Sequence, residues 1–499
     1  MIVMKFGGTS VEDARAIERV AVLVRKRLPQ QPVVVVSAMA RVTDQLLAMG
    51  RAAGSGDRNS AMELARMLRT RHCQTAEQLL SPGQVAELHS ELESDFGLLD
   101  ELLRGIVAVG ELSPRVTDYV LSFGEVLSSK LVTAACVARG LPCVLVDARK
   151  CIVTDAGHTR AVPLFDQTTP RIVATLKPLL QARRVPVMGG FIAATREGVP
   201  TTMGRGGSDF SAAIVGAALE AKRIEIWTDV EGMMTTDPTI CPEARRIKVI
   251  SFDEAAEMAY FGAKVLHPAT IIPAAEKGIP VHVLNSRHPK SKGTCIRARA
   301  PACRSKFRAI AAKKGITIVN VSAARTLITH GFLKAVFEVF DRHRCPVDIV
   351  STSEVSVSLT VESHYDLPAI VADLSKLADV SYEGRQAIVC LVGENIRGTP
   401  GIAAQVFSAV AAGKVNVRMI SQGASEINIS FVIKEADVPE AVRRLHQQFF
   451  TGGRLERRPA KVLGRASTRA NGRETLPPKQ RIANRVESVA RVAERQAYP

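Results

Sequence analysis

Up to about Gly293, the chain alternates short apolar runs with longer segments whose apolar residues recur at spacings of three and four. This alternation predicts an α/β domain in which mainly parallel strands are joined by crossover helices. The predicted strands are Ile2–Phe6, Val33–Ser37, Pro142–Asp147, Val185–Phe191, Ile224–Thr228 and Val281–Asn285. The segments typical of crossover helices include Val11–Leu28, Phe123–Arg139 and Ser208–Ala221. Most of these strands end in small or polar residues, and open α/β sheets bind their ligands at such carboxyl ends.

Composition indicates a folded chain of several domains. A length of 499 residues, 46% apolar content and a mean hydropathy near zero exclude disorder throughout and predict about three domains. The nine cysteines are scattered without a CxxC pair, which disfavours a disulfide framework or a zinc site.

Lys5 and a glycine pair interrupt the N-terminus where a signal peptide needs a continuous apolar stretch. No run of about 18 apolar residues follows, so we expect a cytoplasmic protein without a membrane span.

Two other patterns accompany the α/β domain. Residues 51–104 are rich in Leu, Glu, Arg and Gln and lack strand runs, which predicts a helical hairpin. Residues 308–450 contain a weak internal repeat of two units, each a strand, a helix and two more strands. A glycine, Gly331 or Gly401, precedes the helix of each unit. The order predicts two small ferredoxin-like α+β modules.

The final zone, 454–499, carries twelve basic and four acidic residues. Twelve minus four gives +8, about half of the net charge of +17 that the whole chain carries. Its few bulky apolar residues predict a disordered basic tail. An anion-binding arm is the alternative. Tyr498 is the only aromatic residue in this zone, which disfavours a nucleic-acid partner bound by base stacking.

The opening string KFGGTSVED indicates a phosphate site. It places Lys5 at a strand end, followed by Gly7, Gly8, Thr9 and Ser10 and by a predicted helix with Glu12 and Asp13 in its first turn. Two glycines let the backbone approach an anion, a helix start directs N–H groups at it, and the lysine adds positive charge. An ordinary strand-to-helix turn with an exposed lysine is the alternative.

A second loop, TTMGRGGSD at 201–209, has three glycines before an alanine-rich helix. Arg205 can bind a carboxylate there through two parallel hydrogen bonds, and the coincidence of glycines, Arg205 and Asp209 favours a binding site. For Asp209, in the first helical turn, a simple helix cap is the alternative. Neither loop matches a P-loop or GxGxxG, which disfavours P-loop and dinucleotide enzymes. Thr228, Asp229 and Lys264 form a third polar group, for which solvated turn residues are the alternative.

Together these strings resemble the aspartate kinases (aspartokinases). KFGGTSV, SAMARVT, FGEVLSS, GGFI, TTMGRGGSD, IWTDVEGMMTTDP, AEMAYFGAKVLHP and TSEVSV follow one another in the family's order over roughly residues 1 to 452. The resemblance implies an amino-acid-kinase α/β/α sandwich at 1–293, ACT domains at 308–385 and 386–452, and a tail at 454–499 outside the family pattern. It also implies transfer of the γ-phosphoryl of ATP to the β-carboxylate of L-aspartate. That reaction opens the lysine, threonine and methionine (diaminopimelate) pathway.

Residue roles carry over by motif. Lys5 would bridge the transferring phosphoryl group, and Asp209 would orient Lys5 and related donors. The resemblance assigns the nucleotide to Lys5, Gly7, Gly8, Thr9, Thr228, Asp229, Met234 and Lys264. It assigns aspartate to Ser37, Thr43, Glu125, Phe191, Arg205, Gly206 and Ser208. Mg²⁺ would be carried by the nucleotide, with no metal site on the protein. A carboxylate nucleophile is already ionised at neutral pH, so no general base is required.

The chain departs from the family at three positions. Arg41 stands where many relatives have glycine, Met234 where they have an aromatic residue, and Thr239 where an arginine is common. These departures leave the nucleotide and substrate affinities open.

The regulatory half resembles the lysine-sensitive branch, whose effector site would use Gly331, Val347, Asp348, Thr352, Ser353 and Glu354. A simple turn before a strand is the alternative for Thr352 to Glu354. The preceding segment SAARTLITHG diverges, with Thr326 where relatives often carry methionine. Inhibition by threonine, or none, stays open.

The expected assembly is a homodimer through ACT domains, because pairing between chains would satisfy the exposed edges of their sheets. A tetramer is left open.

Length and the missing dinucleotide motif exclude a fused homoserine dehydrogenase. Two rival functions remain. One is an amino-acid kinase that acts on another acid such as glutamate, and the other is a non-catalytic amino-acid sensor with a decayed kinase site.

Overall fold

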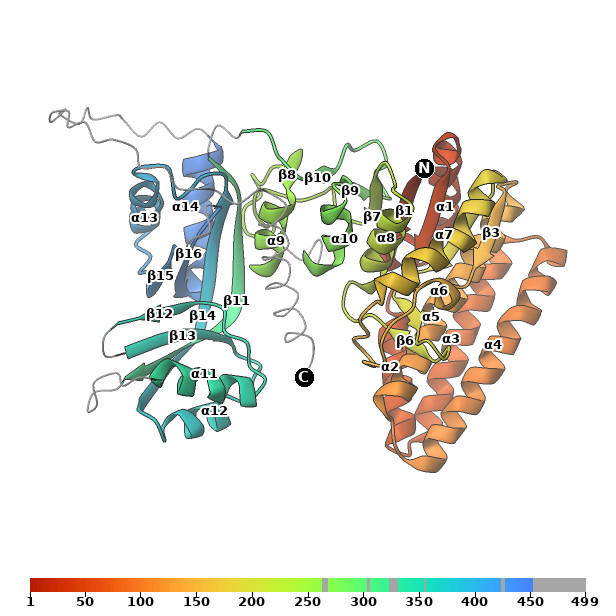
Figure 1. Ribbon diagram of the computed structural model, residues 1–499, viewed down its shortest axis with the longest axis horizontal. Helices are drawn as coiled ribbons and strands as arrows, with labels where there is room; N and C mark the ends of the chain where they lie inside the picture. Colours follow the sequence, from red (N-terminus) through yellow and green to blue (C-terminus); the bar gives the residue numbers. More distant parts are fainter. Residues whose placement is uncertain (263–267, 303–305, 323–330, 354–355, 423–426, 452–499) are drawn as a thin grey trace. The chain divides into compact units, whose positions relative to one another are not determined.

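The computed structural model describes residues 1–262, 268–302, 306–322, 331–353, 356–422 and 427–451. The contacts within it divide the chain into two units (Figure 1). Unit 1 comprises Met1–Met233, Arg246–Ala259 and Lys264–Pro301, and unit 2 comprises Met234–Arg245, Tyr260–Ala263 and Ala302–Pro499. Two short segments from the first 293 residues therefore belong to the C-terminal unit.

Unit 1 is built on an eight-stranded sheet with the order β3-β4-β2-β1-β7-β9-β10-β8. The neighbours from β3 to β9 are parallel, whereas β10 is antiparallel to β9 and parallel to β8. The strands are β1 (Ile2–Phe6), β2 (Pro32–Val36), β3 (Cys143–Val146), β4 (Val185–Gly189), β7 (Ile224–Thr228), β8 (Val249–Ser251), β9 (Val281–Asn285) and β10 (Thr294–Arg297). A separate hairpin pairs β5 (Ile192–Ala194) with β6 (Pro200–Thr202). The predicted α/β class with a mainly parallel sheet is confirmed.

Helices cover both faces of this sheet. They are α1 (Ala14–Arg27), α2 (Val42–Gly54), α3 (Arg58–Leu79), α4 (Pro82–Val109), α5 (Pro114–Ala138), α6 (Ala148–Cys151), α7 (Phe165–Gln181), α8 (Gly207–Ala218), α9 (Phe252–Tyr260) and α10 (Ile272–Glu276). Ile2, Met4 and Phe6 of β1 share a core with residues of α1 to α5. Strand alternation turns Val3 and Lys5 to the opposite face, where α8 packs on β1.

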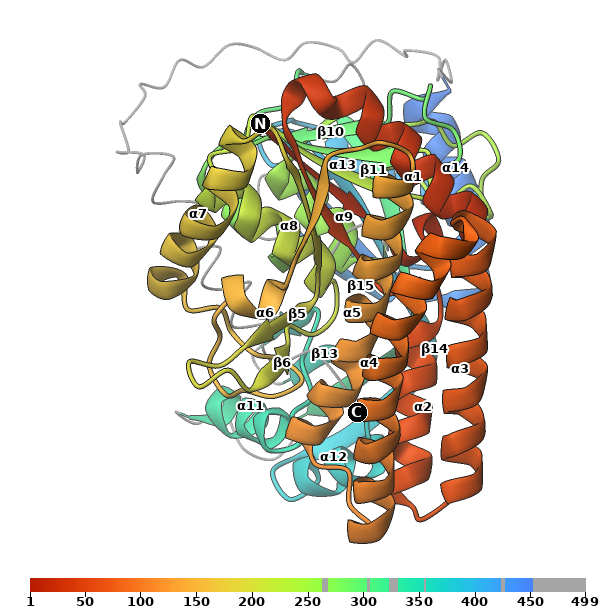
Figure 2. The same cartoon turned by 90° about the vertical axis from the view of Figure 1, so that its right-hand side faces the viewer.

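The predicted helical hairpin is confirmed as α3 and α4. These helices lie beside α2 and α5 in a bundle (Figure 2) and contribute leucines such as Leu92, Leu99 and Leu103 to the core. The central helix α5 is apolar and long enough to cross a membrane, but 67% of its most apolar stretch is buried inside the protein. That burial is the pattern of a core helix.

Unit 2 contains one antiparallel six-stranded sheet with the order β12-β13-β11-β14-β16-β15. Its strands are β11 (Phe307–Ser322), β12 (Val350–Thr352), β13 (Ser356–Glu362), β14 (Asp379–Gly393), β15 (Met419–Ser421) and β16 (Asn428–Lys434). Its helices are α11 (Phe332–Arg342), α12 (Leu367–Leu374), α13 (Ile402–Ala412) and α14 (Val438–Phe450). Each repeat thus has the predicted strand-helix-strand-strand order, extended by a second helix.

The two long strands of unit 2 serve both repeats. Phe307 and Ile310 of β11 pack in a core with α13 and α14, whereas Val319 and Val321 of the same strand pack in a core with α11 and α12. The two α+β modules predicted from the repeat are therefore fused in a single sheet.

Candidate active site

Lys5 and Asp209 form an ion pair between β1 and the first turn of α8. Lys5 Nζ lies 2.6 Å from Asp209 Oδ1, and only 11% and 12% of the two side chains are exposed. Gly206 caps α8 with a φ of 74°, a conformation that favours glycine and lets the chain turn sharply into this helix. The two residues predicted as the catalytic pair are therefore in direct contact.

The glycine loop after β1 is held by backbone contacts. Gly7 N donates to Trp227 O at 3.0 Å, and Ala40 N donates to Gly8 O at 3.2 Å. A Cβ at Gly8 would lie 3.1 Å from Ala38 O, so the close approach of residues 38–40 favours glycine there. The loop therefore packs directly against the SAMARVT segment.

The predicted helix start next to this loop was wrong. Gly8–Ser10 form a separate 3₁₀ turn, and α1 begins only at Ala14. Asp13 precedes the helix, and its side chain accepts a hydrogen bond from Ala16 N at 2.7 Å. Because this carboxylate caps α1, an anion at the loop would meet the N–H groups of the 3₁₀ turn instead of the end of α1.

Glu125 is a buried carboxylate on α5, with 3% of its surface exposed. Its Oε1 accepts a hydrogen bond from Ala38 N at 3.0 Å, while Oε2 has no hydrogen-bond partner among the residues that the structure describes. Burial raises the pKa of Glu125 to about 8, against the smaller opposing effects of the Ala38 N–H and the Lys5 charge. Such a group is poised to accept a cation.

Two glycines bring the walls of the site together. A Cβ at Gly189, the last residue of β4, would lie 2.9 Å from Glu125 Cβ. A Cβ at Gly190 would lie 2.7 Å from Ser208, the neighbour of Asp209. The GGFI string therefore places α5 and the start of α8 against the same strand end, which unites Glu125 with the Lys5–Asp209 pair.

The other residues predicted to bind aspartate lie in the segments that follow β2, β4 and β6. Phe191 has a φ of 61°, which is strained for a bulky side chain, and Gly207 leaves room for its ring. Ser208 is buried and Arg205 is exposed, and Arg205 makes no ion pair with any residue that the structure describes. Ser37 follows β2, and Thr43 lies in the first turn of α2.

The predicted nucleotide residues divide into three groups. Thr228 ends β7 beside the glycine loop, and its hydroxyl donates to Asp229 Oδ1 at 3.2 Å. Met234 belongs to unit 2, as does Thr239, whose hydroxyl donates to Asp237 Oδ1 at 2.7 Å. Lys264 lies outside the described residues.

The predicted effector residues belong to unit 2. Asp348 Oδ1 accepts hydrogen bonds from Lys313 Nζ at 2.8 Å and from Tyr260 Oη at 2.9 Å. Its Oδ2 is buried without a hydrogen-bond partner in the described part of the chain. Burial lowers the pKa of Lys313, but Asp348 and Glu362 together outweigh it and hold that pKa above its usual value.

The remaining effector residues are less constrained. Gly331 caps α11 with a φ of 95°, Val347 is half-buried, and Thr352 ends β12. Ser353 Oγ lies 2.8 Å from Ser356 Oγ. Glu354 and Thr326 lie outside the described residues.

Sequence reasoning missed several polar groups of this region. The Ala38 N–H that holds Glu125 is a backbone group, which carries no side-chain signal. Asp118 lies on the same helix as Glu125, with its carboxylate fully buried. The spacing of seven residues in TDYVLSFGE could have indicated that the two carboxylates share a helix face.

The fold and the charges of this site define the class of protein. The amino acid kinase family matches residues 1–285, and an ACT domain matches residues 389–449. Aspartokinase 1 (chloroplastic) of Arabidopsis thaliana is 37% identical over 468 residues, which cover 91% of this chain and 81% of that protein. Lysine-sensitive aspartokinase 3 of Escherichia coli is 35% identical over 460 residues, which cover 90% and 99%. The chain therefore belongs to the aspartokinase family.

Solved structures agree with this assignment. The crystal structure of E. coli aspartokinase III in complex with aspartate and ADP (R-state) matches with a TM-score of 0.78 at 35% identity, covering 90% of this chain and all of that one. The same enzyme in complex with lysine and aspartate (T-state) matches with a TM-score of 0.77 at 34% identity, covering 90% and 99%. The family resemblance seen in the sequence is confirmed.

Proposed function

We propose that this chain transfers the γ-phosphoryl group of ATP to the β-carboxylate of L-aspartate, giving 4-phospho-L-aspartate. The observation that carries the proposal is the nearly buried Lys5–Asp209 pair beside a buried carboxylate, Glu125, that has one oxygen unpaired. The relatives named aspartokinases, and the aspartate and ADP bound in one of them, support it. The product enters the lysine, threonine and methionine pathway, and the enzyme works in the cytoplasm.

The charges of the site suit a small amino acid with two carboxylates. Glu125 Oε2 accepts a hydrogen bond from the α-ammonium group, whose positive charge compensates the charge of this buried carboxylate. Arg205 is exposed and binds the α-carboxylate through two parallel hydrogen bonds. With both α-groups held, the β-carboxylate is the group left to face the nucleotide.

Transfer depends on position and charge. Lys5 stabilises negative charge on the transferring phosphoryl group, and Asp209 holds the lysine in place. Among the residues that the structure describes, no group of three or more His, Cys, Asp or Glu could hold a metal ion. In this proposal Mg²⁺ is carried by the phosphates of ATP, and no step is assigned to a metal bound by the protein.

We further propose that an amino acid, L-lysine first among them, regulates the enzyme at Asp348. The buried Oδ2 of this residue has no partner among the described residues and suits an ammonium group. The lysine-sensitive relative, and the lysine bound in its T-state structure, support this choice. Pairing of ACT domains between two chains gives a homodimer.

Hydroxamate formation from L-aspartate, ATP, Mg²⁺ and hydroxylamine tests both proposals. The expected result is product with L-aspartate, much less with L-glutamate, and suppression by L-lysine. Lys5→Ala should abolish turnover while the protein still binds amino acids. Product that lysine does not suppress would redirect the search for the effector to threonine. Absence of product in the wild type would favour the non-catalytic sensor.

A further inference from the structure

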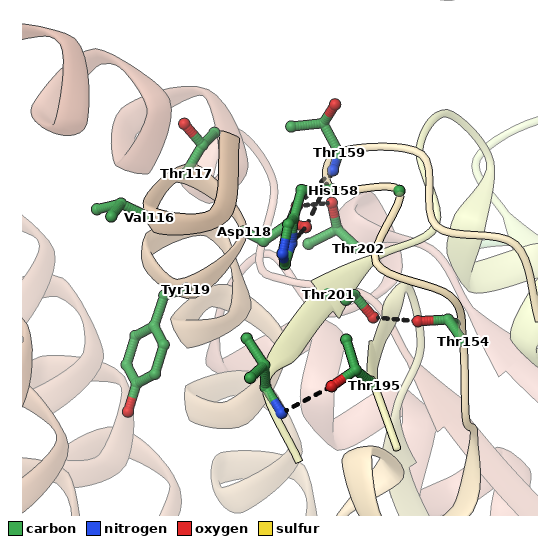
Figure 3. A network of polar contacts seen from close by, with 12 residues as sticks. Val116, Thr117, Asp118, Tyr119, Thr154, His158, Thr159, Thr195, Thr201 and Thr202 are labelled. Atoms are coloured by element: carbon green, nitrogen blue, oxygen red, sulfur yellow. Dashed lines mark hydrogen bonds and ion pairs between the residues drawn. The ribbon is translucent and has the colours of Figure 1, made fainter. Parts of the chain in front are cut away.

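Asp118, on α5, is the centre of a polar network with His158, Thr159 and Thr202 (Figure 3). Its carboxylate is fully buried. It accepts hydrogen bonds from Thr202 Oγ1 at 2.5 Å and from Thr159 N at 3.0 and 2.9 Å to its two oxygens. His158 Nδ1 lies 2.8 Å from Oδ2. Because an ionised carboxylate only accepts, Nδ1 is the nitrogen that carries the proton.

This arrangement is costly for the fold. A carboxylate taken fully out of water loses its hydration, and here neutral donors and an imidazole replace it. Thr159 adopts a φ of 71°, which is unfavourable for a β-branched residue, and this conformation directs its N–H at Asp118. Strain of this kind persists where the surroundings enforce it, and it is concentrated at functional sites.

The network reaches the loop that carries Arg205. Thr202 ends β6, three residues before Arg205, and its carbonyl accepts a hydrogen bond from Ala161 N at 3.0 Å. A Cβ at Gly204 would lie 3.4 Å from the carbonyl oxygen of Thr159. The segment 158–161, which Asp118 holds, therefore braces the chain on the N-terminal side of Arg205.

The same helix also carries Glu125. Residues seven apart lie on one face of a helix, separated by roughly 10 Å along its axis. One turn of α5 therefore carries Glu125, and another carries Asp118, which holds the Arg205 loop through Thr202. The two groups proposed to bind the α-ammonium and the α-carboxylate are thus both positioned by one helix.

We propose that Asp118 is a positioning residue that fixes the Arg205 loop relative to Glu125 and so sets the affinity for the amino-acid substrate. The inference rests on the proposed aspartate kinase activity. Asp118 touches no substrate. It acts through the Thr202 hydroxyl and the Thr159 N–H.

Thr202→Val is the principal test, because it removes the hydroxyl and keeps the shape of the side chain. We expect the KM for aspartate to rise about tenfold, while kcat and the KM for ATP stay within about twofold of wild type. Thr202→Ser retains the hydroxyl and should restore a wild-type KM. Thr195→Val is the matched control, since Thr195 lies in the same hairpin and its hydroxyl interacts with Val199 N at 3.3 Å and with Glu197, neither of which belongs to the Asp118 network. It should leave all three constants unchanged.

A double-mutant cycle separates positioning from a general loss of structure. In an Arg205→Ala background, Thr202→Val should raise the KM no further, because the group it positions is already gone. Equal effects of Thr202→Val with and without Arg205, or a wild-type KM in Thr202→Val, would overturn the inference. Asp118→Asn should raise the KM at least as much and also lower the Tm. If the wild type forms no product from aspartate, the proposed function itself fails, which is a different outcome from an active wild type with an indifferent Thr202→Val.

Discussion

Lys5 Nζ lies 2.6 Å from Asp209 Oδ1, so that a nearly buried ion pair joins the second-last residue of β1 to the first turn of α8. Removing one partner of such a pair leaves the other charge without compensation, which is costly when both are shielded from water. The pair is thus both a structural link and the proposed source of positive charge for the phosphoryl group.

Lys5→Met is expected to lower kcat by about 100-fold or more, because the phosphoryl group loses its positively charged partner. Asp209→Asn keeps the lysine but loosens it, and a smaller loss is expected. Steady-state kinetics with Lys26→Met as a control check this, since Lys26 is exposed on α1. An unchanged kcat in Lys5→Met would remove Lys5 from the transfer step.

Glu125 predicts a dependence of stability on pH. Its pKa of about 8 in the folded protein lies above the ordinary glutamate pKa of 4.5, so the carboxyl group supports the fold at low pH. That contribution is lost as pH rises toward and through 8, where a buried charge forms. Glu125→Gln stays neutral, so its Tm should exceed that of the wild type by more at pH 9 than at pH 5. Thermal unfolding of both proteins at the two pH values decides, and an equal difference at each would contradict the prediction.

The same group predicts the pH dependence of substrate binding. Only the ionised form of Glu125 attracts an ammonium group, so the KM for aspartate should fall between pH 7 and 8.5. Glu125→Gln should raise this KM and abolish its fall with pH. A parallel pH profile in the variant would assign the titration to another residue.

Arg41 precedes α2 with its backbone in the left-handed region, at a φ of 66°, and its side chain makes no capping hydrogen bond to the helix. Arg41→Gly should stabilise the protein by about 1 kcal/mol, since glycine adopts this conformation without steric cost. Arg51→Gly, at the other end of the same helix, should destabilise it by about 1 kcal/mol. Urea denaturation of the two variants measures both signs, and two losses of equal size would show that the position does not matter.

Lys313 pairs with Asp348, the carboxylate proposed to bind the effector. Its Nζ lies 2.8 Å from Asp348 Oδ1 and 2.8 Å from Glu362 Oε1. Lys313→Met should therefore strengthen inhibition by lysine about fivefold, because the ammonium group of the effector meets a carboxylate that is no longer neutralised. Inhibition curves for this variant and for Lys314→Met, an exposed neighbour, test it. Loss of inhibition in Lys313→Met alone would instead make Lys313 part of the effector site.

The sequence was most informative where apolar runs were short and clearly bounded. Ile2–Phe6, Ile224–Thr228 and Val281–Asn285 form strands with the predicted ends, because each is a buried run limited by turn residues. The start of α5 was predicted at Phe123 but lies at Pro114, since its first turns bury polar residues such as Asp118 that hide the helical pattern. Long-range packing also escaped prediction, as in the assignment of Met234–Arg245 to unit 2.

The site was predictable to the extent that it uses charged side chains in glycine loops. Lys5 and Asp209 were found because charged residues beside glycines, at a strand end or a helix start, indicate anion chemistry, whereas Glu125 was assigned only through the family resemblance. The Ala38 N–H and the Thr159 backbone were not found, because they act through main-chain groups whose direction only the fold determines. Asp118 was missed because its partners come from segments about 40 and 84 residues away.

The length of β11 has a consequence for how the C-terminal half unfolds. Since the first residues of this strand complete one hydrophobic core and its last residues complete the other, neither core can be dismantled while the strand stays in place. The two repeats are therefore expected to melt in one cooperative transition, as a single folding unit.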